Sequence, residues 1–213
     1  NSQQNRFQDQ SSVNIEFVSA NPTGPLHLAH GRGAIVGDVL SNLYQFYGHD
    51  VTREYYVNNT GNQINEFLSS ILFHISSKHN FNLPYQQFYK GDYIQELAEK
   101  CFENFKNIFE SPMLSKNEEL QIVNFAIDNL VNQSLKTLKD SGINFDQITY
   151  ETSIVEKKLL PEIIKELEKK GLVYHGQLHD PKDFQGTKKD NEITIFKSTN
   201  FGDDEDRAIT KND

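Results

Sequence analysis

The stretch that most constrains the fold covers residues 16–34, where a strand pattern leads through a turn rich in proline and glycine into a helical pattern. Apolar and polar residues mostly alternate over residues 13–18, which is the period of a strand. Residues 21–25 (Asn-Pro-Thr-Gly-Pro) then end the strand, because proline lacks an amide donor and glycine tolerates positive φ. From Gly31 apolar residues recur every three or four positions, which predicts a helix that ends near Gly48.

Residues 51–57 are rich in β-branched and aromatic side chains and are predicted to form a second strand. The order strand, helix, strand predicts a β-α-β unit, the first half of a parallel, doubly wound sheet. Ligands of such sheets bind beyond the carboxyl ends of the strands. The turn after the first strand is therefore where a ligand is expected.

Two histidines, His27 and His30, lie three residues apart where this helix is expected to begin. Free amide N–H groups and the positive end of the helix dipole make a helix N-terminus a phosphate site. Both imidazoles can donate hydrogen bonds to phosphate oxygens and to the charge that develops when an α-phosphorus is attacked. Neutral donors suffice for this role, so neither histidine needs to titrate.

The same pair has two other interpretations. Histidines near a helix start are common as surface or core residues without a chemical role. The pair could also ligate zinc, but zinc needs further Cys, His or carboxylate ligands at suitable spacing. The chain has one cysteine, Cys101, and contains neither His-Glu-x-x-His nor a paired Cys-x-x-Cys. The sequence therefore predicts no metal ligated by the protein.

The composition is typical of a globular protein in a reducing compartment. The 213 residues, 36% hydrophobic and 24% charged, suffice for one large domain or a domain with an insertion. The lone cysteine excludes an internal disulfide, and the chain shows neither an apolar run of bilayer length nor a signal at its start. A cytoplasmic protein without a membrane partner is expected. The net charge of −9 gives no support for non-specific nucleic-acid binding.

The middle of the chain is predicted to be helical. In three successive segments apolar residues step by three and four positions, so each helix has one apolar face. Cys101 falls on the apolar face of the second helix, which predicts a buried core thiol. Ser115 and Glu118 have the spacing of a capping box before the third helix. The segments are residues 64–75, 94–109 and 120–138.

Residues 145–153 return to a strand pattern, and Ser153 with Glu156 has the form of another capping box. Pro161 interrupts the helical pattern that follows, because an interior proline loses a hydrogen bond and clashes with the preceding turn. We therefore expect a short helical turn to about residue 159 and a helix over residues 160–170.

The last part of the chain is predicted to contain a loop and two strands. Residues 172–192 have a loop composition, in which His175 and His179 could ligate a metal but are interpreted as solvated. The strands are expected at residues 193–196 and 208–210, around an acidic segment whose spacing differs from a calcium loop and predicts a solvated turn.

Residues 19–32 (Ser-Ala-Asn-Pro-Thr-Gly-Pro-Leu-His-Leu-Ala-His-Gly-Arg) resemble the HIGH signature region of class I aminoacyl-tRNA synthetases, in the form carried by arginyl-tRNA synthetases. Residues 50–64 extend the resemblance, which covers roughly residues 13–213. The four-residue His-x-x-His alone is unspecific, because other adenylyl- and cytidylyltransferases use a related motif at the same fold position. The flanking Ser-Ala-Asn and Tyr-Val-Asn-Asn segments argue against those enzymes.

The resemblance implies a Rossmann-like α/β fold, the first half of a class I catalytic domain with a mostly helical insertion. It implies ATP-dependent ligation of L-arginine to the tRNA for arginine through an arginyl-adenylate, with ATP and its Mg²⁺ as substrate. A monomer is expected. The alternatives are a non-catalytic paralogue that binds nucleotide or amino acid, and another His-x-x-His nucleotidyltransferase.

The resemblance also implies roles for single residues within a signature region from Ala20 to His30. His27 and His30 match the catalytic pair that stabilises the charged transition state. The implied ATP-binding residues are Thr23, Gly24, Pro25, Leu26, His27, Ala29, His30 and Gly31. The implied arginine-binding residues are Glu16, Ser19, Ala20, Asn21, His30 and Glu151. Without the resemblance, Glu16 would be interpreted as an exposed strand residue and Glu151 as a helix-flanking acid.

The sequence departs from the family in two ways. Ala29 replaces the glycine usual at the third signature position, which adds a methyl group where adenine approaches the backbone. The second signature and the anticodon-binding domain of the family would lie beyond residue 213, so we expect an incomplete, inactive piece of the enzyme. The expected organisation is a linker (1–12), the first half of the catalytic domain (13–66), a helical insertion (67–145) and a return to the catalytic domain (146–213).

Overall fold

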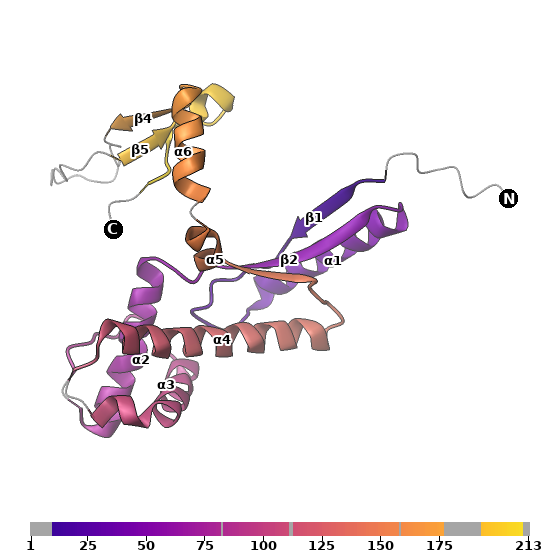
Figure 1. Ribbon diagram of the computed structural model, residues 1–213. Coiled ribbons are helices and arrows are strands. Elements are labelled where there is room, and N and C mark those ends of the chain that lie inside the picture. The colour runs from indigo at the N-terminus through magenta and orange to yellow at the C-terminus, as the bar shows by residue number, and fades with distance from the viewer. Residues whose placement is uncertain (1–9, 82, 111–112, 158, 177–192, 211–213) are drawn as a thin grey trace. The chain divides into compact units, whose positions relative to one another are not determined.

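The computed structural model describes residues 10–81, 83–110, 113–157, 159–176 and 193–210 (Figure 1). The chain forms two compact units, Asn1–Ser153 and Ile154–Asp213.

Three parallel strands form the sheet of the first unit, in the order β1 (Ser12–Glu16), β2 (Asp50–Val57), β3 (Gln147–Tyr150). Parallel neighbours need a crossover connection, and α1 (Leu28–Phe46) supplies it between β1 and β2 (Figure 1). The predicted β-α-β unit and the Rossmann-like fold class are thus confirmed.

The segment between β2 and β3 is helical, as predicted. It contains α2 (Asn62–His79), α3 (Asp92–Asn104), the 3₁₀ helix η1 (Lys106–Glu110) and α4 (Lys116–Asp140). Cys101 is buried in their shared core, and burial raises the pKa of its thiol to about 12, which confirms the core interpretation. The Ser115 hydroxyl accepts from the Glu118 amide at 3.3 Å, and the Ser115 amide donates to the Glu118 carboxylate at 2.7 Å, which confirms the capping box. Among the described helices, none is both long and apolar enough to cross a bilayer.

The start of α1 differs from the prediction. The helix begins at Leu28 instead of Gly31, with His27 as its N-cap residue, so both histidines lie at the cap and in the first turn. Its buried face consists of the small residues Ala34, Gly37 and Ser41. The apolar residues that set the predicted period are exposed in the part of the chain that the structure describes; they are Ile35, Val36, Val39, Leu40 and Leu43.

The helix α5 (Glu151–Glu156) directly follows β3. Ser153 lies inside α5, where its hydroxyl donates to the Tyr150 carbonyl at 2.6 Å, so the predicted capping box at Ser153 was wrong. A serine within a helix commonly bonds back to the preceding turn in this way.

The second unit begins within α5 and contains α6 (Leu159–Lys169), with Pro161 in its first turn, where a missing amide costs least. An antiparallel sheet follows, in the order β4 (Val173–Gly176), β5 (Ile193–Phe196), β6 (Arg207–Ala208). The strand predicted at residues 193–196 is confirmed as β5, whereas the strand predicted at residues 208–210 was misplaced, because β6 covers only Arg207–Ala208. The loop interpretation of residues 172–192 was wrong at β4, which pairs with β5. His175 lies on β4, and His179 lies outside the described residues.

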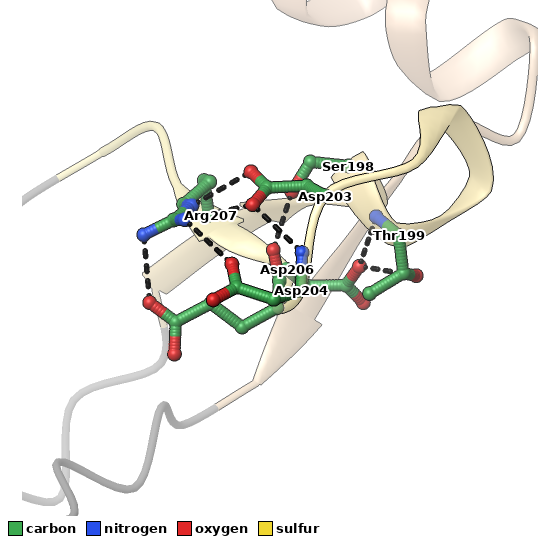
Figure 2. A network of polar contacts seen from close by, with 7 residues as sticks. Ser198, Thr199, Asp203, Asp204, Asp206 and Arg207 are labelled. Atoms are coloured by element: carbon green, nitrogen blue, oxygen red, sulfur yellow. Dashed lines mark hydrogen bonds and ion pairs between the residues drawn. The ribbon is translucent and has the colours of Figure 1, made fainter.

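The acidic segment between η2 (Ser198–Phe201) and β6 forms a turn closed around Arg207 (Figure 2). The guanidinium donates to both carboxylate oxygens of Asp203 at 2.8 Å and to Glu205 at 2.7 Å, and it holds the pKa of Asp203 well below its usual range. Asp206 accepts from the amide and hydroxyl of Thr199 at 3.1 and 2.7 Å. These carboxylates are engaged within the turn.

The polar face of the parallel sheet is organised by Glu54 on the central strand. Its carboxylate accepts hydrogen bonds from Asn14 on β1 and from Gln147 and Thr149 on β3, the Gln147 bond being 3.1 Å long. The bonds from Thr149 and Asn14 lower the pKa of Glu54. One ionised side chain thus connects all three strands.

A methyl group added at Gly37 should disrupt the packing of α1 against the sheet, because its Cβ would overlap the ring of Phe17. We expect Gly37→Ala to lower the free energy of unfolding by about 1–3 kcal/mol, the usual cost of overpacking. Gly33→Ala is the matched control, since a Cβ there meets nothing within 4 Å; it should be neutral or stabilise by up to about 1 kcal/mol. Urea unfolding measures both, and equal effects would contradict the packing account.

The Glu54 network predicts an acid-sensitive stability. Because the pKa of Glu54 is lowered from 4.5 in the folded chain, its contribution is complete above pH 4.5 and is lost as the pH falls through the folded-state pKa. The urea midpoint of the wild-type chain should therefore fall more steeply below pH 4.5 than that of Glu54→Gln. Parallel pH profiles of the two proteins would rule this out.

Candidate nucleotide and amino-acid site

The site begins with an unusual turn at the carboxyl end of β1. Val18 and Ser19 have φ values of 67° and 38°, and the Ser19 amide donates to the Phe17 carbonyl at 3.0 Å, which makes a γ-turn centred on Val18. Left-handed backbone at a β-branched residue is strained and persists where the surroundings fix it. Here the Ser19 hydroxyl accepts from the Tyr56 amide of β2 at 3.0 Å.

The segment from Asn21 to Leu26 connects this turn to α1. The Asn21 side chain is exposed and donates to Gln63 of α2 at 2.9 Å, whereas Pro22 and Thr23 are buried. Leu26 packs against the core, while Pro25 and Ala29 are exposed. A Cβ at Gly31 would meet nothing within 4 Å, so the backbone there is open to close approach.

The two histidines form a stacked pair at the N-terminus of α1. Their ring centroids are 3.8 Å apart with an interplanar angle of 22°, and the Nδ1 atom of His30 accepts from the His27 amide at 3.2 Å. An accepting Nδ1 leaves the proton on Nε2, which can donate to a ligand. Burial and the neighbouring His27 lower the pKa of His30. His30 is therefore a neutral donor at neutral pH, which suffices for the role expected from the sequence.

Two predicted acidic residues influence Tyr56 through their charge. Glu16 ends β1 and Glu151 begins α5 directly after β3. Burial raises the pKa of Tyr56, and the charges of Glu151 and Glu16 raise it further, so all three side chains share one electrostatic environment. No hydrogen bond or ion pair described for the structure joins either carboxylate to His27 or His30, so the predicted residues form two groups along one edge of the sheet.

Two asparagines that directly follow β2 were not predicted from the sequence as site residues. When the side-chain amide of Asn58 is oriented with its nitrogen toward Glu151 and Thr60, it donates to the Glu151 carboxylate at 2.6 Å and to the Thr60 carbonyl at 3.3 Å. Asn59 donates to the Thr152 hydroxyl at 2.9 Å and accepts from the Thr152 amide at 3.1 Å. These asparagines fix the start of α5, and their place after the carboxyl end of β2 was the signal that could have revealed them.

Within the described residues, no group of three or more His, Cys, Asp and Glu side chains is arranged to hold a metal ion. A parallel sheet with a helix N-terminus at the carboxyl end of its first strand, and polar side chains after the next two strands, is characteristic of a nucleotide-binding α/β domain.

Comparison with known proteins specifies the family. The family model for the catalytic domain of class I tRNA synthetases (R) matches residues 1–179. The arginine–tRNA ligase of Pelagibacter ubique is 43% identical over 211 residues, which cover 93% of this chain and 35% of the relative. That of Rickettsia akari is 40% identical over 206 residues, 95% of this chain and 35% of the relative. The chain thus belongs to the class I tRNA synthetase (R) family and spans about a third of the length of these relatives.

Solved structures agree with this assignment. A structure from Campylobacter jejuni described as an arginyl-tRNA synthetase superimposes with a TM-score of 0.74 at 32% identity, covering 96% of this chain and 41% of that chain. The arginyl-tRNA synthetase of Thermus thermophilus shares the fold, with a TM-score of 0.58 at 14% identity over 96% of this chain and 33% of that chain.

The histidine pair predicts a measurable titration. His30 should titrate below 6.5, and His27→Asn should raise its pKa without restoring 6.5, because burial is the larger cause and persists in the variant. Asparagine keeps the helix start, since it is a favourable N-cap residue. NMR of the ring nitrogens and protons across pH measures both proteins, and a His30 pKa at or above 6.5 in the wild type would refute the neutral-donor account.

Proposed function

We propose that this chain supplies the ATP- and arginine-binding part of an arginine–tRNA ligase. In this reaction the carboxylate of L-arginine attacks the α-phosphorus of ATP, pyrophosphate leaves, and a ribose hydroxyl of the tRNA then displaces AMP from the arginyl-adenylate. The observation that carries the proposal is the stacked histidine pair at the N-terminus of α1, in a chain of the class I tRNA synthetase (R) family.

The phosphate end of the site is the N-terminus of α1. The helix dipole, its first amides and the Nε2–H of His30 all favour negative charge there. The charge on the α-phosphate grows as the arginine carboxylate attacks, so prearranged donors lower the barrier. Thr23 and Gly24 shape the turn beside ATP, and Gly31 leaves room for the nucleotide. Mg²⁺ would accompany ATP as part of the substrate.

The amino-acid end is the pair of carboxylates at Tyr56. Arginine carries two cationic groups, the α-ammonium and the guanidinium, and each needs an anionic partner when it leaves water. Glu16 is assigned to the α-ammonium and Glu151 to the guanidinium, with Ser19, Ala20, Asn21 and His30 as further contacts of the arginine. The hydrogen bond from Asn58 supports the Glu151 assignment, because it orients a carboxylate that can accept a bidentate guanidinium.

The 213-residue chain is proposed to bind these substrates without completing the ligation. The support for this is its length, about a third of that of its relatives. The tRNA is proposed as a partner of the whole enzyme, and the monomeric state stays a prediction.

A non-hydrolysable arginyl-adenylate analogue should bind the chain, and Glu151→Gln should weaken that binding about tenfold or more, because a charge-assisted pair is lost. Isothermal titration calorimetry measures both affinities. Glu156→Gln is the matched control, since Glu156 ends the same helix and is exposed. The lysyl-adenylate analogue tests selectivity for the guanidinium.

Equal affinity for the arginyl and lysyl analogues would refute the arginine assignment and leave a nucleotide-binding domain. Binding of neither analogue would show that the named residues do not assemble a pocket in this chain. Arginylation of tRNA by the chain alone would contradict the proposal that it cannot complete the reaction.

A further inference from the structure

The turn that carries the signature is held from outside by two tyrosine hydroxyls. The Tyr55 hydroxyl of β2 donates to the Ala20 carbonyl at 3.4 Å, and the Tyr93 hydroxyl of α3 donates to the Thr23 carbonyl at 2.9 Å. The Tyr55 contact thus connects the signature turn to the central strand, and the Tyr93 contact connects it to the helices between β2 and β3.

The Tyr93 hydroxyl is fixed independently of the turn. Tyr93 lies in the first turn of α3, and the following residues Ile94, Leu97 and Cys101 are buried in the core shared with α2 and α4. Burial raises the pKa of Tyr93, with Tyr89 as a further cause, so the hydroxyl keeps its proton and donates. A helix anchored in this way presents the donor at a constant position.

The turn lies closely against this hydroxyl over two successive residues. Thr23 is only 8% exposed, so its carbonyl has little access to water if Tyr93 no longer donates. A Cβ at the neighbouring Gly24 would lie 3.7 Å from the Tyr93 hydroxyl oxygen, in ordinary van der Waals contact. Only three residues lie between Thr23 and His27, the N-cap of α1, so a displaced Thr23 would carry the histidine pair with it.

We propose that Tyr93 is a positioning residue of the ATP site: its hydroxyl fixes the Thr23 carbonyl, and the helical insertion thereby sets the geometry of the phosphate-binding turn. The role of the turn in binding ATP rests on the proposed function. The hydrogen bond and its effect on the turn are independent of that function and can be tested separately.

Tyr93→Phe keeps the ring in the core and removes only the hydroxyl. Tyr85→Phe is the matched control, because the Tyr85 hydroxyl donates to Glu119 at 2.6 Å within the helical region and does not contact the turn. Amide hydrogen exchange of the 213-residue chain should become faster at residues 20, 21, 23 and 24 in Tyr93→Phe and stay unchanged there in Tyr85→Phe. In the full-length protein, assayed in the presence of the tRNA for arginine, the kcat of arginine-dependent ATP–pyrophosphate exchange should fall about tenfold in Tyr93→Phe, with the KM for arginine unchanged.

Each result decides between the alternatives. Unchanged exchange at the turn in Tyr93→Phe, or equal acceleration in Tyr85→Phe, would overturn the positioning role. Faster exchange with unaltered kinetics in an active enzyme would overturn its connection to ATP. If the wild-type full-length protein shows no arginine-dependent activity, the proposed function fails, while hydrogen exchange still decides whether Tyr93 holds the turn.

Discussion

The left-handed backbone at Val18 and Ser19 is the constraint on which the whole site depends. It turns the chain away from β1 so that the signature segment crosses the carboxyl end of the sheet before α1 begins. Such conformations cost about 1–3 kcal/mol each and need surroundings that enforce them. The enforcing contacts come from other elements: the amide of Tyr56, the hydroxyl of Tyr55 and the hydroxyl of Tyr93. Strain in the turn is thus offset by the sheet and the helices together.

The two groups of polar residues follow different strands and suit ligand groups of opposite charge. The segment after β1 offers neutral donors at a helix N-terminus, which suit an anion, whereas the ends of β1 and β3 offer two carboxylates near Tyr56, which suit cations. Opposite charge preferences at one edge of the sheet match the reaction proposed above, between an anionic nucleotide and an amino acid that carries two cationic groups.

Local patterns predicted most of the fold, and contacts between distant residues explain what they missed. The strands of the parallel sheet, the strand β5, the helical middle and the capping box at Ser115 depend on neighbours within a few positions, so they could be predicted from the sequence. The early start of α1 was hidden, because a His27 cap lacks the usual Ser, Thr, Asp or Asn signal. The strand β4 was hidden because its partner β5 lies about twenty residues further on. Tyr93 and Thr23 lie 70 positions apart, so no local sequence pattern could indicate their contact.

The carboxylate of Glu54 also affects the register in which β2 pairs with its neighbouring strands. Along β2, Val51, Tyr55 and Val57 are buried, while Glu54 lies on the opposite face among polar partners. Because side chains alternate, a slip of β2 by one residue would exchange the two faces. It would drive an ionised group into the apolar layer beneath the sheet and bring Tyr55 out of it, away from Ala20. Glu54 therefore favours a single register of the strands. In that register the strained turn makes the hydrogen bonds that hold it.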